Sequence, residues 1–235
     1  MLPMRFFRSR AFSAGNAAIF CVFGSLFGAV FFFPQLLQNG LGYGPLEAGL
    51  RLLPWTGTFL VIAPAAGALA DRVGERPLMV GGLLIQAAGM AWIAALAEPG
   101  LDYSRLVVPL IVAGVGTSLA IPSAQNSVMG SAADASLGKA AGTNSMMREL
   151  GGVFGIALAV AFFAAAGSYA SPDAFTDGFT AAIHVTAAIA LVGAGIGTAL
   201  PGRRARAAMS GSRRGRRGGR GMSAVNLVPR GMTAI

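Results

Sequence analysis

Charged residues and metal-binding side chains are scarce in this sequence. Only 11% of its 235 residues are charged, and it has one cysteine, Cys21, and one histidine, His184. A single cysteine cannot form a disulfide within the chain, and one Cys with one His cannot supply the ligands of a structural zinc site. Soluble domains carry about 25% charged residues, so the composition also excludes an ordinary water-soluble domain.

The signatures of common enzyme sites are absent from the sequence too. It has no Gly-x-Ser-x-Gly nucleophile motif, no Gly-x-x-x-x-Gly-Lys-Ser/Thr phosphate loop, and no cluster of His, Cys and acidic residues. Each of these motifs brings together groups that the chemistry needs in one place. We therefore expect neither an enzyme nor a bound metal or cofactor.

Long apolar runs dominate what is present. Hydrophobic residues make up 54% of the sequence, and mean hydropathy is +0.65. A helix needs roughly 20 mostly apolar residues to cross the hydrocarbon core of a bilayer. The sequence predicts an all-α polytopic membrane protein whose six transmembrane helices cover residues 15–38, 46–70, 77–97, 106–129, 145–167 and 178–200.

Basic residues predict the orientation of these helices in a cell membrane. Nearly all of the 18 Lys and Arg residues fall on one side if both ends of the chain are cytoplasmic. Cytoplasmic segments of membrane proteins carry such an excess. The chain then divides into a cytoplasmic N-terminal segment, a six-helix transmembrane domain and an Arg/Gly-rich disordered cytoplasmic tail, at residues 1–14, 15–200 and 201–235.

The tail at 201–235 has two interpretations. Arg/Gly-rich segments that bind single-stranded nucleic acid also carry aromatic residues on which bases stack, and this tail has none. The other interpretation is a solvated anchor that touches anionic lipid, with about 1 kcal/mol for each basic residue near the surface. We favour the anchor and expect no specific nucleic-acid partner.

A short polar turn separates the second apolar run from the third. It contains Gly67, Asp71, Arg72, Gly74 and Arg76. Gly67 permits close helix packing and Gly74 a tight turn. The Asp carboxylate can accept hydrogen bonds from a neighbouring helix N-terminus, and the arginines hold the turn in the cytoplasm. The pattern indicates either a conformational hinge or an ordinary cytoplasmic turn.

The same turn resembles motif A of the major facilitator superfamily, Gly-x-Leu-Ala-Asp-Arg-x-Gly-Arg-Lys, with Glu75 where the motif has a basic residue. Residues 42–54 and 148–157 are similar to stretches of the fourteen-helix drug:proton antiporter branch. The resemblance covers most of residues 5–200. It implies the C-terminal six-helix half of such a protein, built from two inverted three-helix repeats.

This resemblance implies one half of a proton-coupled multidrug efflux antiporter that works by alternating access. Its partners would be the bilayer and either the missing N-terminal transporter half or a second copy. Its substrates would be small amphipathic or cationic drug-like molecules, and its energy source a proton gradient. The alternative is a truncated, non-transporting membrane protein that acts as an assembly or regulatory partner.

The resemblance also implies that the first, second, fourth and fifth spans line the substrate cavity. Phenylalanines at 20, 23, 27 and 31 share one helix face, which forms either a cavity wall or a packing surface. Uncharged polar residues in the spans face either the cavity or another helix. The candidate cavity residues are Phe27, Gln35, Trp55, Thr58, Asn126, Asn144 and Arg148.

We expect no carboxylate in the middle of a span. Arg148 and Glu149 fall near the start of the fifth run, which predicts a location at the cytoplasmic interface, where charge is less costly. Glu47 and Arg51 are four residues apart and predict an ion pair on one helix face. A proton-coupled carrier needs a titratable group, and His184, the single histidine, is a candidate by residue type.

Overall fold

The computed structural model describes residues 10–129 and 137–200, and residues 1–9, 130–136 and 201–235 lie outside that description. The predicted Arg/Gly-rich tail and most of the predicted N-terminal segment therefore fall outside the described residues. Within the described ranges every regular element is a helix. This confirms the all-α fold class.

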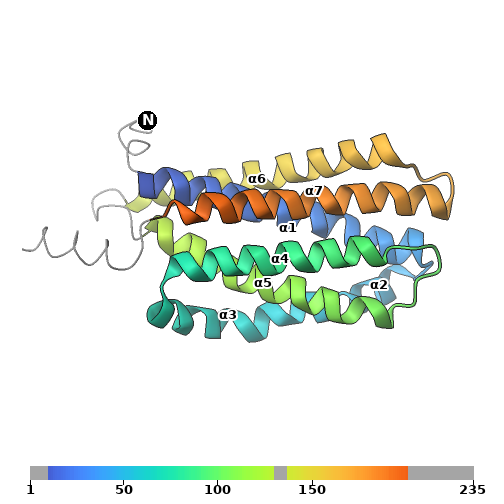
Figure 1. Ribbon diagram of the computed structural model, residues 1–235, viewed down its shortest axis with the longest axis horizontal. Helices are drawn as coiled ribbons and strands as arrows, with labels where there is room; N and C mark the ends of the chain where they lie inside the picture. The colour runs from blue at the N-terminus through green and yellow to red at the C-terminus, as the bar shows by residue number, and fades with distance from the viewer. Residues whose placement is uncertain (1–9, 130–136, 201–235) are drawn as a thin grey trace, which may run out of the picture. The chain divides into compact units, whose positions relative to one another are not determined.

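Six of the described helices are long and apolar enough to cross a membrane, as the sequence predicts. A short π-helical segment continues the first span, and a short helix precedes the second (Figure 1). The elements are α1 (Arg10–Gln35), η2 (Leu36–Gly40), α2 (Pro45–Arg51), α3 (Leu53–Val73), α4 (Glu75–Leu96), α5 (Ser104–Met129), α6 (Leu137–Ala166) and α7 (Pro172–Thr198).

The second apolar run is not one helix, in contrast to the prediction. It divides at Leu52 into α2 and α3, because Pro54 has no N–H group to continue the hydrogen-bond ladder. The N–H groups of Trp55 and Thr56 both donate to the Leu52 carbonyl oxygen, each at 3.0 Å. The second membrane span is therefore α3 alone.

The fifth span begins earlier than predicted. α6 starts at Leu137 rather than at residue 145 and is 30 residues long. Its first turns contain Gly138, Gly142 and Asn144, residue types with low helix propensity, which made this part of the helix hard to find in the sequence. As a consequence, Arg148 lies about three turns inside α6 rather than at its end.

Two short connections define the ends of the bundle. Gly74 alone separates α3 from α4, at the end where α1 begins (Figure 1). The α4–α5 and α6–α7 loops lie at the opposite end, which contains Gly100. We call these the Gly74 end and the Gly100 end. Gly74 has φ 100°, a region that strains other residues, which confirms the prediction of a glycine-dependent turn.

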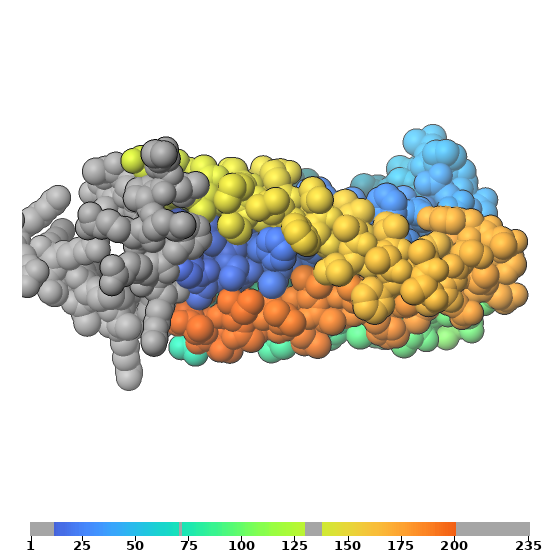
Figure 2. All heavy atoms as spheres, turned by 90° about the horizontal axis from the view of Figure 1, so that it is seen from above, coloured from blue at the N-terminus to red at the C-terminus, as the bar shows by residue number. Residues whose placement is uncertain are grey.

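Contacts between the helices follow an approximate two-fold pattern. α1 packs on α6 and α7, while α5 packs on α3 and α4. α1 also contacts α5, and α4 contacts α7; Figure 2 shows α1 in blue between α6 in yellow and α7 in orange. Exchanging α1, α3 and α4 with α5, α6 and α7 reproduces these main contacts. Because each repeat has three antiparallel spans, the second repeat crosses in the opposite sense, as predicted.

The core consists of two apolar clusters with a polar contact between them. Gln86 Nε2 of α4 donates to Ser25 Oγ of α1 at 3.0 Å, and both side chains are completely buried. Water cannot satisfy these groups inside a bilayer, so this bond joins two helices in mid-span. The cluster toward the Gly100 end includes Phe32, Phe33, Phe163, Phe175 and Phe179, and the other includes Phe12, Ile19, Met79, Leu83 and Val128.

Glycines bring the backbones of α1 and α6 into contact. A Cβ added to Gly24 would lie 3.1 Å from the Gly151 carbonyl oxygen, and one added to Gly155 would overlap the Gly24 carbonyl group. A Cβ on Gly28 would meet the Gly155 carbonyl oxygen at 3.3 Å. The Gly24-xxx-Gly28 and Gly151-xxx-Gly155 pairs therefore face each other, as expected for small-residue helix contacts.

Gly155→Ala tests this contact. We expect it to lower the free energy of unfolding by about 1–3 kcal/mol, as overpacking does in other tightly packed cores. Gly195→Ala is the matched control, because a Cβ there would meet no atom within 4 Å. Titration of helicity with dodecyl sulfate in mixed micelles measures the free energy of unfolding of both variants. Equal stability of the two variants would contradict the close contact.

Candidate functional site

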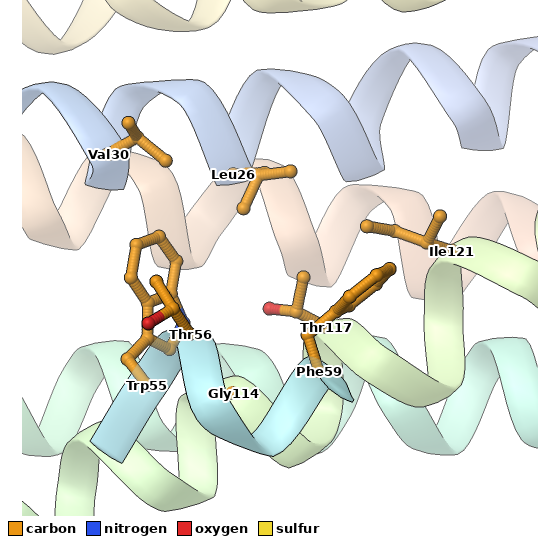
Figure 3. A pocket seen from close by; sticks show the side chains of 8 residues that line it. All are labelled: Leu26, Val30, Trp55, Thr56, Phe59, Gly114, Thr117 and Ile121. Carbon is orange, nitrogen blue, oxygen red and sulfur yellow. The ribbon is translucent and has the colours of Figure 1, made fainter. Parts of the chain in front are cut away.

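A groove of about 320 Å³ opens between α1, α3 and α5 (Figure 3). Leu26 and Val30 of α1 lie on one side of it, and α3 and α5 form the opposite wall. Its lining residues are Leu26, Val30, Trp55, Thr56, Phe59, Gly114, Thr117 and Ile121.

The lining of the groove is apolar and aromatic, with two hydroxyl groups. Trp55 is buried and packs edge-on against Phe33, with ring centroids 5.0 Å apart, while Phe59 is 43% exposed. The hydroxyls of Thr56 and Thr117 donate to carbonyl oxygens one turn earlier, at 3.2 Å and 2.9 Å. Their oxygens keep lone pairs that can accept a hydrogen bond. The lining suits a flat apolar molecule that carries a hydrogen-bond donor.

The groove lies near the middle of the membrane. Leu26 is ~21 Å from each end of the Phe12–Gly40 span, and Thr117 is ~18–20 Å from each end of α5. Gly114 allows α3 to approach α5, because a Cβ on it would overlap Thr58 Oγ1. Small residues and a mid-membrane position are the usual setting of a carrier's binding site.

The wall formed by α3 is held at its Gly100 end by a stack of three side chains. The Arg51 guanidinium lies 3.8 Å from the Tyr43 ring centroid and 4.6 Å from that of Tyr103. Arg51 Nη2 also donates to Glu47 Oε1 at 2.7 Å, which confirms the predicted ion pair. That hydrogen bond raises the pKa of Arg51.

Tyr103 also supplies a hydrogen bond to the carbonyl oxygen that the helix break at Leu52 leaves free. In a continuous helix the Trp55 N–H would donate to the Arg51 carbonyl oxygen, but it donates to Leu52 instead. The Tyr103 hydroxyl donates to the Arg51 carbonyl oxygen at 2.7 Å. Because Tyr103 directly precedes α5, this bond ties the start of α3 to the start of α5, the two helices of the groove wall.

Removing the Tyr103 hydroxyl should loosen this connection. We expect Tyr103→Phe to lower the free energy of unfolding by about 0.5–1.5 kcal/mol, the usual net contribution of one hydrogen bond. Tyr43→Phe is the control, because Tyr43 contributes its ring to the stack and keeps it in this variant. Dodecyl sulfate titration measures the unfolding midpoint of both variants. An unchanged midpoint for Tyr103→Phe would show that the bond contributes nothing to stability.

Two of the predicted cavity residues lie at the groove. Trp55 lines it directly. Thr58 lies one turn farther along α3 and donates to the Trp55 carbonyl oxygen at 2.5 Å, with its side chain against Gly114. The other predicted residues are elsewhere in the bundle.

Phe27 and Gln35 take part in helix packing. A Cβ on Gly152 of α6 would lie 3.0 Å from the Phe27 ring, and that ring also lies at a tilt beside Phe23, with 6.2 Å between centroids. Gln35 Oε1 accepts from the Tyr169 hydroxyl, which ties the end of α1 to the α6–α7 loop. These contacts support the packing interpretation of the phenylalanine face on α1.

Asn126 and Asn144 lie toward the Gly74 end and are not groove residues. Asn126 is exposed near the end of α5. Asn144 is 8% exposed on α6, and its Nδ2 has no hydrogen-bond partner among the described groups.

The motif A-like turn lies at the Gly74 end, away from the groove. Arg72 and Arg76 are exposed there. A Cβ on Gly67 would meet no atom within 4 Å, so within the described bundle Gly67 does not serve the close helix packing that we expected. Asp71 belongs to the last turn of α3, and its side chain lies outside what the structure describes.

Arg148 and Glu149 lie about three turns after the start of α6 at Leu137. A Cβ on nearby Gly151 would overlap the Phe20 backbone of α1. Arg148 Nη2 lies 3.0 Å from Glu149 Oε1, and its guanidinium is 5.6 Å from the Phe23 ring centroid. The location of this pair at the cytoplasmic interface stays a prediction.

Seven groove residues were missed in the sequence. A signal was present, because Leu26 and Val30 are four apart, as are Trp55 and Phe59, a spacing that places each pair on one helix face. Apolar faces of this kind occur on every span, however, and only the packing of α1, α3 and α5 selects these. The missed residues are Leu26, Val30, Thr56, Phe59, Gly114, Thr117 and Ile121.

Six spans in two inverted repeats, with a mid-membrane groove, define a bundle of the transporter type. Residues 15–229 match the family described as Major Facilitator Superfamily, and the chain belongs to this family. This confirms the resemblance seen in the motif A-like turn, and it places the chain in a family of membrane transporters.

Similar proteins include several drug exporters. The chain is 29% identical to the tetracenomycin C resistance and export protein of Streptomyces glaucescens over 75% of its length and 33% of that protein. It is 29% identical to the multidrug transporter protein MdtP of Bacillus subtilis, over 67% of its length and 29% of the relative. It is 33% identical to the uncharacterized transporter YebQ of Escherichia coli, over 67% and 34%. The chain thus spans about a third of these relatives.

Proposed function

We propose that this chain is one half of a proton-coupled multidrug efflux antiporter that works by alternating access. The groove between α1, α3 and α5 carries this proposal, because it places an apolar, aromatic binding surface at mid-membrane on one face of an inverted-repeat bundle. The printed functions of the relatives, drug export and multidrug transport, support the same conclusion.

The uneven burial of the helices supports a second bundle as partner. In α3, 17% of the most apolar stretch is buried, and in α6 28%, against 44–61% in the other spans. These two helices occupy equivalent positions in the two repeats. Exposed Leu60 and Val61 on α3, and Val153 and Phe154 on α6, would pack on the missing half or on a second copy.

The substrates that fit this wall are small amphipathic molecules with a planar apolar part. Trp55 and Phe59 offer ring surfaces, and the face of an aromatic ring also attracts a cation. The lining itself carries no charge. Aromatic cations therefore remain within the substrate class, together with neutral aromatic molecules.

The alternative is a non-transporting membrane protein that acts as an assembly or regulatory partner. It shares the exposed α3 and α6 faces but gives the groove no ligand. Ligand binding to the groove therefore separates the two functions.

The two tryptophans of the chain allow a direct binding test. In a Trp92→Phe variant, Trp55 in the groove is the sole tryptophan, and tetraphenylphosphonium or a neutral polycyclic dye should quench its fluorescence. Trp55→Phe keeps only Trp92, which is 46% exposed on α4 outside the groove, and should show no saturable quenching. Adding Phe59→Ala to Trp92→Phe should weaken binding about three- to tenfold, the effect of one aromatic contact.

Saturable quenching of Trp92 with none of Trp55 would place the ligand elsewhere. If neither tryptophan responds and cells that also express a second bundle show no efflux, the non-transporting alternative is correct.

The proposed orientation places both termini in the cytoplasm and the Gly100 end outside. In a Cys21→Ser background, Asp173→Cys should react with an impermeant maleimide in intact cells, because it lies in the first turn of α7 at that end. Arg213→Cys should react only after the cells are opened. Equal labelling of both in intact cells would contradict the six-crossing orientation.

A further inference from the structure

The indole nitrogen of Trp55 is a hydrogen-bond donor without an acceptor in the described part of the bundle. Trp55 is 6% exposed, and its ring packs edge-on against Phe33. The hydroxyls of Thr56 and Thr58, on the same helix, donate to backbone carbonyl oxygens, and no described group accepts from Trp55 Nε1. A buried tryptophan usually finds a partner for its N–H group, because an unpaired donor away from water is unfavourable.

This nitrogen lies at the wall of the groove. A Cβ added to Gly114 would lie 3.1 Å from Trp55 Cδ1, the ring atom bonded to Nε1. Both residues line the groove (Figure 3). Nε1 is not one of the completely enclosed polar atoms that lack a partner in the described residues, so it keeps some accessible surface. Because Trp55 lines the groove, a molecule bound there can reach this donor.

The groove favours an occupant that brings its own apolar surface. Gly114 lies ~15 Å from the start of α5 and ~22 Å from its end, so this wall is inside the hydrocarbon core. An ordered water needs about two to four polar partners, whereas the residues that lie on the other side of the groove from Trp55 are Leu26 and Val30.

The second tryptophan of the chain has a different environment. Trp92 is 46% exposed and lies ~6 Å along α4 from Leu96, where the span ends. Tryptophans near the end of a span place the polar edge of the ring at the membrane–water interface. The N–H of Trp92 can therefore be hydrated, whereas that of Trp55 depends on what occupies the groove.

We propose that the Trp55 N–H donates to an acceptor oxygen of the molecule in the groove, and so selects planar aromatic compounds that carry a carbonyl group over those that lack one; the inference rests on the proposed function of the groove. A carbonyl oxygen offers two lone pairs and no hydrogen, so it complements an indole N–H. The ring system of the ligand covers the apolar lining, while its oxygen pairs with Nε1.

An isosteric replacement tests this hydrogen bond. In benzothienylalanine a sulfur atom takes the place of the indole N–H, so the ring keeps its shape and loses the donor. At Trp55 this replacement should weaken binding of fluorenone about two- to tenfold, the contribution of one hydrogen bond, and leave binding of fluorene, which lacks the carbonyl, unchanged. Isothermal titration calorimetry of the full chain in detergent micelles measures both affinities. The same replacement at Trp92, outside the groove, is the matched control and should change neither.

A vibrational measurement detects the donor directly. In the Trp92→Phe chain Trp55 is the sole tryptophan, and its ultraviolet resonance Raman spectrum contains an indole band that responds to hydrogen bonding of the N–H group. Fluorenone should shift this band toward its hydrogen-bonded position, whereas fluorene should leave it in place. A band that does not move at saturating fluorenone overturns the inference.

The outcomes separate this inference from the function on which it rests. If the benzothienyl variant changes the affinities for fluorenone and fluorene equally, or changes neither, Trp55 contributes ring shape alone, which overturns the inference and leaves the groove function intact. The same conclusion follows if fluorenone does not bind while tetraphenylphosphonium still quenches Trp55. If none of these ligands binds, the proposed function fails and the inference fails with it.

Discussion

The hydrocarbon core of a bilayer offers no hydrogen-bond partners and little compensation for charge, and this constraint accounts for the main features of the bundle. Each span is a helix, which satisfies its own backbone. Where Pro54 breaks the second run, the freed Arg51 carbonyl oxygen accepts from Tyr103, at the edge of the membrane rather than within it. In mid-span, the buried Gln86 donates through its Nε2 to Ser25 Oγ on another helix.

The same solvent changes what holds helices together. Because lipid is as apolar as a leucine side chain, helices associate through close packing rather than through the hydrophobic effect. Gly24 and Gly155 provide that packing between α1 and α6, and Gly114 provides it between α3 and α5. The central helices pack against other helices on several faces, whereas α3 and α6 are each buried mainly on one face. The groove arises beside the less buried α3.

The Glu47–Arg51 and Arg148–Glu149 ion pairs lie in different parts of the bundle and are both exposed. The Glu47–Arg51 pair lies at the Gly100 end, between two tyrosine rings, and contributes to the anchoring of α3. The Arg148–Glu149 pair lies on the exposed face of α6, with the Arg148 guanidinium 5.6 Å from the Phe23 ring centroid.

The sequence by itself determined the number and type of elements, since spans are set by runs of apolar residues and hydrocarbon thickness. It also identified the glycine turn at Gly74, the Glu47–Arg51 pair and the family, because these depend on residues close together in the chain. The tertiary structure alone decided which apolar faces form the groove, because Leu26, Phe59 and Thr117 come together only when three spans pack. It also decided where α6 begins, since tertiary contacts outweigh the low helix propensity of its first turns.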